Sequence, residues 1–503
     1  MSATTSTGPE SLEDDSKSEG SDIKSVLDPR LRPIILSTLT AISLAAFDGL
    51  GVTAAQNAIA GDLGHVALLS WVFAAFSLTL TIAAVAAGPL IDTFGLSVVY
   101  RFTLVSFFVA SALCCFAPTM PLLIAARALQ GLGGGLIVSV ALSAIGITFP
   151  AHLRSRAFAA NSTIWGVMSF AGPALAALLL KTPLGWRAVF AVNLPLTAFA
   201  AIVGWNRLPG PSTAESAPRA RFDTRGLVLV AIFATAVLLG ASELNRWSIL
   251  AIVVAAFAGT AAWRFAGRTT DPVLARRYLN QLPNAAINWA IFTVFAGGIA
   301  VETFVPLFVK GGLGHSDLAG AFSVTFMALG WTMASIVVSR LLDRVKEISA
   351  MMVGFFIALT PLVIGLIFYG PGTPLWLVAF NSFVQGAGIG ATTNAGLTLL
   401  QKTTPTDEMG RANAAHQFVR NLGSTIGVAA AGGILFGFVR HRLGNLSAIQ
   451  PLLKGSKNVA VSASARNAVA LGYRWSHVLA VTLVLSGLLI TLRLRAYLQS
   501  QPV

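Results

Sequence analysis

Apolar stretches of about twenty residues recur along this chain from Pro33 almost to its C-terminus. A helix needs about 20 consecutive apolar residues to cross the hydrocarbon layer of a membrane, because it rises about 1.5 Å per residue. The chain is 55% hydrophobic and 11% charged, whereas a typical soluble domain has about 25% charged residues. With 503 residues and a mean hydropathy of +0.75, we expect an all-α polytopic membrane protein.

The apolar stretches predict fourteen membrane-spanning helices, and an even number places both termini on the same side of the membrane. The predicted spans are 33–60, 67–91, 101–118, 120–147, 157–180, 187–206, 226–241, 247–264, 285–309, 317–339, 348–369, 374–400, 411–437 and 476–494. Lysine and arginine in short loops accumulate on the cytoplasmic side. Sixteen of them fall on the side of the termini and four on the other. We therefore expect a multi-pass protein of the cell membrane, plasma or inner, with both termini in the cytoplasm.

The spans divide the chain into two bundles of six helices separated by a linker. We expect the bundles at 33–206 and 285–496, and the linker at 207–284 contains two additional spans. Residues 1–32 are rich in Ser, Thr, Glu and Asp and lack the apolar core of a signal peptide, so we expect a disordered cytoplasmic tail there. A short cytoplasmic tail is predicted at 497–503.

The charge of the chain points to membrane topology rather than to nucleic acid. The net charge of +14 comes from basic residues scattered between the apolar spans, and such residues fix orientation in a membrane. One segment departs from the charge rule, because the external loop predicted at 438–475 has six basic residues and no acid. The two cysteines, Cys114 and Cys115, are adjacent in an apolar run and can build neither a disulfide framework nor a metal site.

Four features of the first half of the chain recur in the second half at an almost constant spacing. The pairs are Asp48 and Glu302, Asp92 and Asp343, Gln130 and Gln385, and Arg156 and Arg411, at spacings of 254, 251, 255 and 255 residues. Two six-helix halves in the same orientation explain these matches, with the two linker spans inserted between them. Parallel halves related by an axis along the membrane normal are one known transporter plan, and the substrate site of such proteins lies between the halves near mid-membrane.

Two acidic residues, Asp48 and Glu302, lie well inside predicted spans. An ionised carboxylate in hydrocarbon is unfavourable by several kcal/mol, so an intramembrane acid indicates a functional site. Counting the rise of each helix places Arg127 of the fourth span at a similar depth, which makes it a candidate partner of Asp48. Alternating exposure of Asp48 to water and to Arg127 would load and release a proton. The alternatives are a static pair that locks two helices, and for Glu302 a water-filled vestibule.

Further polar residues inside the spans are candidates for the transport cavity. His416, Gln417 and Arg420 form a second polar cluster on the thirteenth span, and Asn161 lies in the fifth. Because a charge needs a polar environment, we expect Arg420 to face the cavity. Contact with a phosphate or lipid headgroup near the inner surface is the alternative.

Glycines distinguish two of the spans. Gly131 and the glycines that follow it make one side of the fourth span thin, which lets another helix backbone approach closely. Gly172 and Pro173 in the fifth span remove a backbone hydrogen bond and allow bending. The glycines indicate either plain helix packing or an interface that moves.

These motifs resemble the signatures of the major facilitator superfamily, specifically of its fourteen-helix drug:proton antiporter branch. The stretch GPLIDTFG, with Gly88, Asp92 and Gly95, is similar to the signature of the first cytoplasmic loop. The matching loop of the second half contains Asp343 and Arg344. By this resemblance the two loops would form cytoplasmic gates.

The resemblance extends to three more segments. The stretch LIAARALQGLGGG places Arg127, Gln130 and Gly131 where the fourth-helix signature has them. Gly172 and Pro173 represent the fifth-helix antiporter signature, and GWRAVFAVNLPL is similar to a stretch that is typical of this branch. By this resemblance, Gln130 and Gly131 would serve helix packing, and Gly172 and Pro173 would serve bending.

The resemblance covers roughly residues 33–437 and implies a major facilitator fold, with two pseudo-symmetric six-helix bundles and two extra central helices. It also implies rocker-switch transport without ATP, coupled to protons and usually directed outward for lipophilic compounds. Asp48 lies where the branch usually has an acid in its first helix. The chain departs from the family pattern at Leu96 and Ser97, which replace the basic residues that normally follow the loop glycine.

The leading interpretation is a proton-coupled secondary transporter that exports lipophilic or cationic small molecules by alternating access. Three alternatives remain: an exporter of one endogenous lipid, siderophore or metabolite, a proton-coupled importer, and a non-transporting membrane receptor. An enzyme or an ATP-driven pump is disfavoured, because the sequence has neither a GxxxxGK(S/T) phosphate loop nor an HExxH metal pair. We expect a monomer with no cofactor and no metal. Its expected partners are a small-molecule substrate, protons and membrane lipids, and not nucleic acid.

Overall fold

The structure is a computed structural model. It describes residues 27–208, 223–242, 246–269, 274–342, 344–405, 409–453 and 459–500, together with Ser25 and Pro272. The predicted tail at 1–32 lies mostly outside these residues, as does Asp343, and the structure does not describe the side chains of Asp92 and Asn161. The secondary structure of the described residues is helical throughout, which confirms the prediction of an all-α membrane protein.

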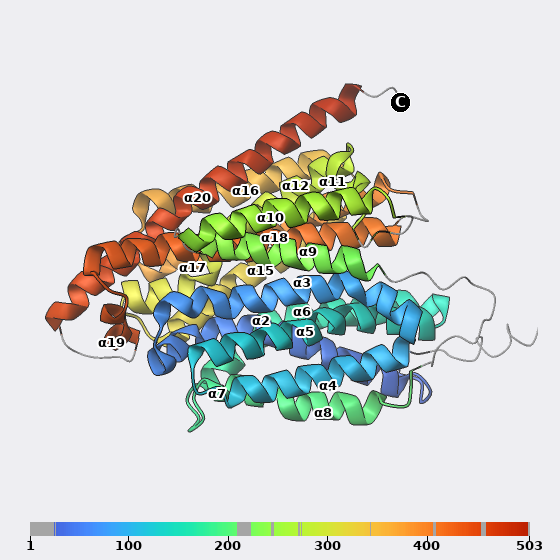
Figure 1. The fold of residues 1–503 in the computed structure, drawn as a ribbon, viewed down its shortest axis with the longest axis horizontal. Helices are drawn as coiled ribbons and strands as arrows, with labels where there is room; N and C mark the ends of the chain where they lie inside the picture. The colour runs from blue at the N-terminus through green and yellow to red at the C-terminus, as the bar shows by residue number, and fades with distance from the viewer. Residues whose placement is uncertain are drawn as a thin grey trace, which may run out of the picture.

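The helices run lengthwise beside one another (Figure 1). The first half of the chain contains α2 (Arg32–Leu63), the 3-10 helix η1 (Val66–Leu68), α3 (Leu69–Phe94), α4 (Leu96–Cys115), α5 (Met120–Thr148), α6 (Ala151–Leu179), α7 (Arg187–Ala191) and α8 (Asn193–Gly204). The linker contains α9 (Thr224–Ser242) and α10 (Arg246–Ala266). The end of the bundle at which α2 begins is called the proximal end here, and the end at which α2 stops is the distal end.

The second half begins with a helix that is interrupted by π-helical turns. Its elements are α11 (Arg277–Asn280), α12 (Asn284–Val294), the π-helix η2 (Phe295–Ile299), α13 (Ala300–Thr303), α14 (Val305–Leu307), the π-helix η3 (Phe308–Gly312), α15 (Asp317–Leu341), α16 (Glu347–Phe368), α17 (Leu375–Lys402), α18 (Met409–Leu443), the 3-10 helix η5 (Ser447–Ile449), α19 (Gln450–Leu453) and α20 (Val459–Ser500). The last helix ends toward the proximal end, where α2 begins (Figure 1).

Within the described residues, ten helices are long and apolar enough to cross a membrane. An eleventh candidate is α2, which is bent by 44° between its segments Arg32–Gly49 and Gly51–Leu63. The helices α6, α9 and α17 occupy the positions of further predicted spans but do not meet the same criterion over the described residues. The chain is therefore a multi-pass membrane protein, and the count of fourteen spans stays a prediction.

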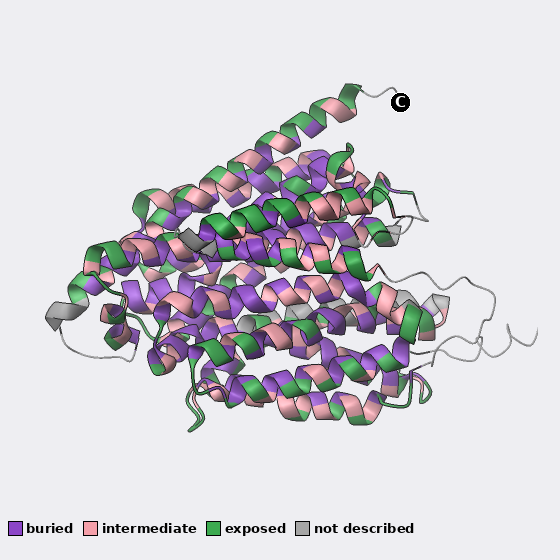
Figure 2. Ribbon diagram, viewed as in Figure 1, coloured by how far each residue is buried: buried purple, intermediate pink, exposed green. Residues whose placement is uncertain are grey.

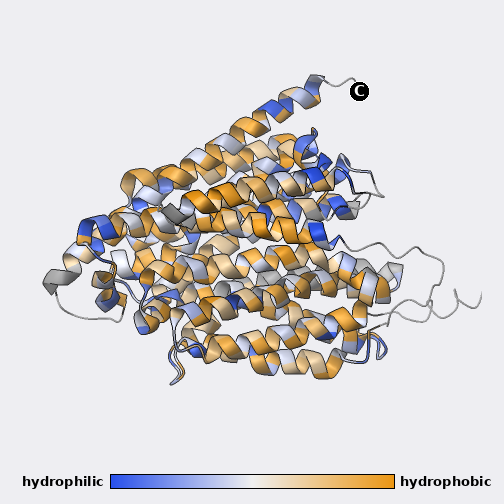
Figure 3. Ribbon diagram, in the orientation of Figure 1, coloured by the Kyte–Doolittle hydropathy of each residue, from blue (hydrophilic) through white to orange (hydrophobic). Residues whose placement is uncertain are grey.

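The outer surface of the bundle is apolar along the length of the helices, and hydrophilic residues gather toward its two ends (Figure 3). The linker helix α10 illustrates this pattern, since much of its surface is exposed (Figure 2). Its exposed large apolar side chains are Ile249, Leu250, Ile252, Val253, Val254 and Phe257. An apolar face of this size is stable against lipid, because lipid tails are as apolar as the side chains themselves.

The two halves are built alike. In the first half α5 packs against α3 and α4, and in the second half the equivalent α17 packs against α15 and α16. Between the halves, α3 packs against α18 and α6 packs against α15. The repeat equivalent of α3 is α15, and that of α6 is α18. The two contacts between the halves are therefore equivalent to each other. This is the pattern expected of halves related by a two-fold axis along the bundle, which is the plan of parallel-repeat transporters.

Side-chain hydrogen bonds join the halves near the distal end. The amide nitrogen of Gln56 donates to the carbonyl of Thr303 at 3.0 Å, and that of Asn57 donates to the carbonyl of Pro306 at 2.9 Å. From α19, Gln450 donates to the carbonyl of Gly61 at 3.2 Å. All three bonds reach the last third of α2, so the distal ends of the two halves are held together.

The loop predicted at 438–475 differs in the structure, because most of it is helical. The helix α18 continues to Leu443, and α20 begins at Val459, well before the predicted start of the last span. With 42 residues, α20 is roughly 63 Å long, about twice the thickness of a hydrocarbon layer. In Figure 1 its first turns and α19 extend beyond the neighbouring helices at the distal end. A hydropathy scan detects only the apolar part of such a helix.

Two glycines let α5 lie directly against α3. A Cβ atom added at Gly131 would lie 2.2 Å from the carbonyl oxygen of Phe76, and one added at Gly135 would lie 2.2 Å from that of Leu80. These are backbone atoms, which cannot move aside without moving the helix. The close approach accounts for the glycines of LQGLGGG as packing residues.

The substitution Gly135→Ala is expected to lower the free energy of unfolding by about 1–3 kcal/mol, because overpacking a tight contact forces the helices apart. The matched control is Gly146→Ala on the same helix, where an added Cβ meets nothing within 4 Å. Alanine favours helix over glycine by about 1 kcal/mol, so the control should be neutral or more stable. Thermal unfolding of the detergent-solubilised protein measures both variants. Equal midpoints for the two would contradict the close approach.

Candidate functional site

The first buried acid is paired with an arginine across two helices. Nη1 of Arg127 on α5 donates to Oδ2 of Asp48 on α2 at 2.6 Å. Both residues are 1% exposed. The structure therefore brings together the two residues whose similar depth was predicted from the rise of their helices. Breaking a buried ion pair of this kind is strongly unfavourable, because the remaining charge is then buried without compensation.

The pair belongs to a larger network of hydrogen bonds. Nε2 of Gln130 donates to Oδ1 of Asp48 at 3.0 Å and is also 3.0 Å from Oγ of Ser111, while its Oε1 accepts from Nη1 of Arg127 at 2.7 Å. Nδ2 of Asn193 on α8 lies 3.5 Å from Oδ1 of Asp48. The role expected for Gln130 was helix packing, and the structure adds direct contacts with both charges.

The guanidinium of Arg127 is held on its remaining sides as well. Its Nε donates to the carbonyl of Val72 at 3.3 Å, and its Cζ lies 3.9 Å from the ring centroid of Phe76, within the range of a cation–π contact. Both partners are on α3. Helices α2, α3 and α5 therefore meet at one charged side chain, and a shift of any of them changes the environment of Asp48.

Asn193 is a residue of this site that was not predicted from the sequence. Asn193 is 0% exposed, and its own Oδ1 has no hydrogen-bond partner within the described structure. It is part of the stretch GWRAVFAVNLPL, which resembles the family. A polar amide inside an apolar helix was the available signal, and contact with Asp48 could be recognised only once α8 was placed beside α2.

The second buried acid has no cationic partner among the described residues. Glu302 on α13 is 7% exposed, its Oε2 has no hydrogen-bond partner, and no ion pair to it is found in the part of the chain that the structure describes. The hydroxyl of Ser382 on α17 interacts with its carboxyl group. Ser382 stands 255 residues after Arg127, so it is the repeat equivalent of that arginine. The second half keeps the acid and replaces the cation by a serine.

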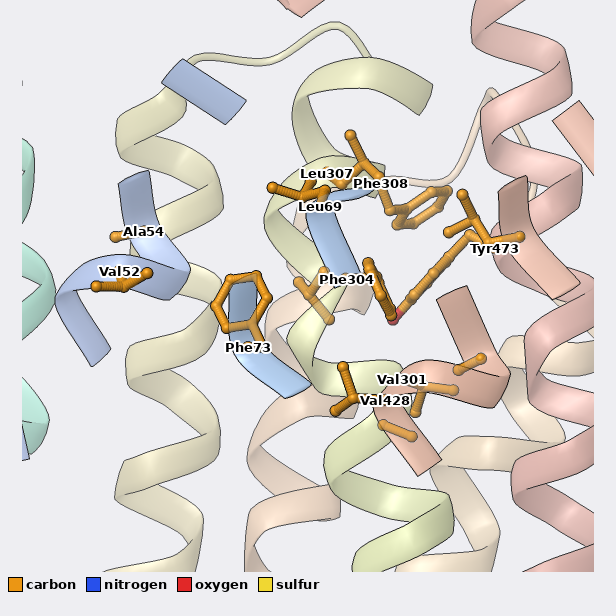
Figure 4. Close-up of a cluster of buried hydrophobic side chains, with 14 of the residues drawn as sticks. Val52, Ala54, Leu69, Phe73, Val301, Phe304, Leu307, Phe308, Val428 and Tyr473 are labelled. Carbon is orange, nitrogen blue, oxygen red and sulfur yellow. The ribbon is translucent and has the colours of Figure 1, made fainter. Parts of the chain in front are cut away.

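The surroundings of Glu302 are apolar and aromatic. Its neighbours Val301 and Phe304 belong to a buried hydrophobic cluster that also contains Phe73 of α3 and Val428 of α18 (Figure 4). This cluster includes side chains from both halves. An ionised carboxylate is poorly solvated in such a place, so a carboxyl group without a cation is more stable there in its neutral form.

A stack of rings lies close to this acid. The ring of Phe308 is stacked on Tyr473 and Tyr369, with centroids 4.5 and 5.1 Å apart, and His477 packs edge-on against both tyrosines. Nδ2 of Asn381 is 3.0 Å from the hydroxyl of Tyr369. These residues come from η3, α17 and α20 of the second half and from the residue directly after α16. No sequence motif predicted these residues, because isolated tyrosines and histidines in apolar spans form no pattern.

The polar cluster on α18 lies apart from both acids. Nδ1 of His416 is 2.9 Å from Oδ1 of Asn288 on α12, and the guanidinium of Arg420 lies over the ring of Phe295, 5.3 Å from its centroid. Gln417 is partly exposed. The structure thus separates the residues predicted for the cavity into a distal acid level and a more proximal basic level.

Of the residues predicted for the gates and for bending, those that the structure describes are found in helices or in the turns between them. Gly95 joins α3 to α4 with φ = 83°, a conformation that glycine adopts without strain. Gly88 has open space around it, and Arg344 is exposed. Gly172 is buried inside α6, and Pro173 is an internal residue of that helix. Their roles in gating and bending stay predictions.

Comparisons with known proteins agree with this architecture. The model of the Major Facilitator Superfamily matches residues 36–428. Two proteins of Bacillus subtilis (strain 168) are similar in sequence. The multidrug transporter protein MdtP is 28% identical over 426 residues, which is 82% of this chain and 76% of that protein. Multidrug resistance protein 3 is 26% identical over 457 residues, which is 86% of this chain and 84% of that protein.

The fold also resembles a solved transporter structure. An inward-facing, unoccupied bacterial homologue of the human lysosomal transporter Spinster superimposes with a TM-score of 0.67, and the match covers 95% of this chain and 99% of that one. At 17% identity this likeness concerns the fold alone. The family model matches most of the chain. The two-fold relation of the halves also agrees with the parallel-repeat plan of these transporters. The chain belongs to the major facilitator superfamily.

Proposed function

We propose that this protein is a proton-coupled secondary transporter that exports lipophilic or cationic small molecules by alternating access. The observation that carries the proposal is the pair of repeat-equivalent buried acids. Within the part of the chain that the structure describes, Asp48 has a cationic partner and Glu302 has none. A membrane protein retains buried acids at a considerable loss of stability, which a scaffold would have no reason to accept. The two multidrug transporters with similar sequences support the choice of substrate class.

In the proposed cycle the two acids have different tasks. Glu302 would hold a proton while it is enclosed by apolar side chains and release the proton when its surroundings open to water. The Asp48–Arg127 pair would open and close as α2 shifts against α5 during the cycle, because its partners lie on different helices of the first half. An inward-moving proton supplies about 2.3 kcal/mol per 100 mV of membrane potential, plus about 1.4 kcal/mol per unit of pH difference.

Each end of the bundle can also be assigned to one side of the membrane. With both termini in the cytoplasm, as the distribution of basic residues favours, the distal end would face outward. The bonds from Gln56 and Asn57 to the second half would then close the outer side in the conformation described here. Export would require these bonds to break when the cavity opens outward.

Transport by the purified protein in liposomes tests the proposal. We expect an imposed pH gradient, acidic on the external face, to drive ethidium across the membrane against its concentration gradient. A protonophore should abolish this accumulation, and protein-free liposomes provide the background. An ethidium flux that is the same with and without the gradient would argue for facilitated diffusion, and no flux of any probe would favour a receptor or scaffold.

A further inference from the structure

A row of polar side chains follows one face of α18. Asn413, His416, Gln417 and Arg420 stand at positions that share a helix face, since their spacings are three, four and seven residues. Arg420 is eleven residues from the proximal start of α18 at Met409, or about 16 Å along the helix. This depth is near the middle of a hydrocarbon layer of about 30 Å. Arg420 is therefore far from the headgroup level at either end.

The helix that carries the row lies where the two halves meet. The helix α18 packs against α3 of the first half and against η2 of the second half. Phe418, Val419 and Leu422 cover the α3 side, where they belong to one hydrophobic cluster with Ala74 and Leu78 of α3. Arg420 remains partly exposed between these buried neighbours. In a transporter with two-fold related halves, this interface is the expected location of the substrate.

Arg420 is a cation without a counter-charge among the described residues. Its Nε is buried with no hydrogen-bond acceptor, and no ion pair to Arg420 is found in the parts of the chain that the structure covers. Its contact with Phe295 engages the face of a ring rather than an anion. An unpaired charge at this depth is unfavourable, so an anionic partner would be bound strongly.

The helices packed against α18 offer little negative charge. The segments in contact with it are α3, α9, α11, α12, η2, α13, α17 and α20. Over their described residues they contain two acids, Asp92 and Glu302. Asp92 belongs to the last turn of α3 at the proximal end, and Glu302 lies seven residues beyond Phe295, roughly 10 Å further along the bundle. The basic groups on the same segments, such as Arg277 and Arg466, add to the positive charge.

His416 contributes an acceptor next to this cation. Nδ2 of Asn288 donates to the carbonyl of Tyr278 at 2.8 Å, which fixes the orientation of the amide, so Oδ1 of Asn288 accepts from Nδ1 of His416. In the neutral ring the proton is then on Nδ1, and Nε2 carries a free lone pair. The structure gives Nε2 no partner, although it is buried. The row therefore presents one cation and two acceptors, Nε2 of His416 and Oδ1 of Asn413, without partners among the described residues.

We propose that Arg420, together with His416, forms a subsite that binds the anionic group of a lipophilic substrate, such as a carboxylate or a sulfonate. The guanidinium pairs with the anion, and Nε2 of His416 accepts from a hydroxyl or N–H group of the same ligand. The inference rests on the proposed function, because it takes the interface between the halves as the transport route. It extends the substrates from lipophilic and cationic compounds to lipophilic acids.

Two matched fluorescent probes test the subsite in the full-length protein held in nanodiscs. The anionic probe is 8-anilinonaphthalene-1-sulfonate, and the neutral probe is N-phenyl-1-naphthylamine, which has the same aromatic rings without the sulfonate. In Arg420→Gln the Kd of the anionic probe should rise at least about tenfold, which corresponds to about 1.4 kcal/mol, while that of the neutral probe stays nearly constant. Arg420→Lys should lie between, because it keeps the charge and loses the planar donor fork.

The matched control is Arg440→Gln, which removes an exposed arginine from the distal end of the same helix. It should bind both probes as the original protein does. If Arg420→Gln weakens the binding of both probes equally, or of neither, the subsite is contradicted. If that variant does not fold, the unmodified protein decides the question. The anionic probe should then raise its thermal midpoint more than the neutral probe does, because a ligand stabilises the state that binds it. Equal shifts would reject the subsite.

Lipid composition distinguishes a substrate from a headgroup as the source of the anion. A substrate site binds the anionic probe equally in discs of phosphatidylcholine and in discs that contain phosphatidylglycerol. A headgroup site is already occupied in the anionic discs, so weaker binding of the probe there would overturn the substrate assignment. Binding that depends on Arg420 in a protein that moves no probe along a proton gradient would contradict the proposed function and leave the subsite intact.

Discussion

The substitution Asp48→Asn is expected to lower the free energy of unfolding by about 3–5 kcal/mol and to abolish proton-driven transport. Asp48 is the counter-charge of Arg127 in a place that is 1% exposed. Without the carboxylate, Arg127 remains buried and uncompensated, which is the most destabilising way to break an ion pair. Thermal or denaturant unfolding measures the first effect, and ethidium accumulation in liposomes measures the second.

The double variant Asp48→Asn/Arg127→Gln separates these two effects. Removal of both charges leaves no uncompensated ion, so most of the lost stability should return. Transport should stay absent, because the carboxyl group that exchanges a proton has gone. A double variant that regains proton-driven transport would mean that the pair only locks α2 to α5, and that coupling resides elsewhere.

A second pair on the same helix provides the control for Asp48. Asp62 near the distal end of α2 accepts from Nη1 of Arg187 at 2.8 Å, but its side chain is 51% exposed. An exposed pair contributes about 0–1 kcal/mol to stability. The free energy of unfolding of Asp62→Asn should therefore lie within about 1 kcal/mol of that of the unmodified protein. The contrast between Asp48 and Asp62 tests whether burial, rather than pairing as such, sets the size of the effect.

The substitution Glu302→Gln is expected to abolish proton coupling as well, but with little change in the free energy of unfolding. Glutamine resembles the neutral carboxyl group in shape and in hydrogen bonding. If Glu302 is neutral in the enclosed state, the free energy of unfolding should change by less than about 1 kcal/mol. The amide cannot take up or release a proton, so the proton gradient should no longer drive accumulation.

Counterflow distinguishes lost coupling from lost transport in Glu302→Gln. Exchange of labelled for unlabelled substrate requires no net movement of protons, and it should continue in this variant. Asp317→Asn is the control, since Asp317 pairs with Lys310 at 2.7 Å in a more exposed position of the same half. Accumulation by Glu302→Gln that responds normally to the pH gradient would remove Glu302 from the coupling mechanism. A large loss of stability would show that its carboxyl group is ionised and paired in the enclosed state.

The different profiles follow from one difference between the repeats. Both halves keep a buried acid and a buried glutamine at equivalent positions, Gln130 and Gln385. Gln130 bridges Asp48 and Arg127, whereas neither polar atom of Gln385 has a partner in the described structure. The residue that differs is Ser382, which occupies the position of Arg127. The acid of the first half is therefore compensated within its own bundle, and the acid of the second half is not.

The sequence alone determined the class of protein and the depth of its charged residues. Recurring apolar stretches were sufficient to identify a polytopic membrane protein, because the thickness of the bilayer fixes the length of a spanning helix. The rise of a helix is constant, so a residue number converts directly into a depth, and Asp48 and Arg127 were expected at one level for that reason. The repeat spacing showed that the chain has two related halves.

The tertiary structure decided which side chains meet at each level. Depth does not specify how a helix is rotated or which helix lies beside it, and both depend on the fit between segments that are far apart in the chain. Asn193 and Gln130 were therefore found beside Asp48 only after α8 and α5 were packed on α2, and Ser382 was found beside Glu302 in the same way. The extension of α18 and α20 beyond the apolar segments was also decided at this level, because most of the stability of a helix comes from tertiary packing, and here η5 and α19 pack against α20.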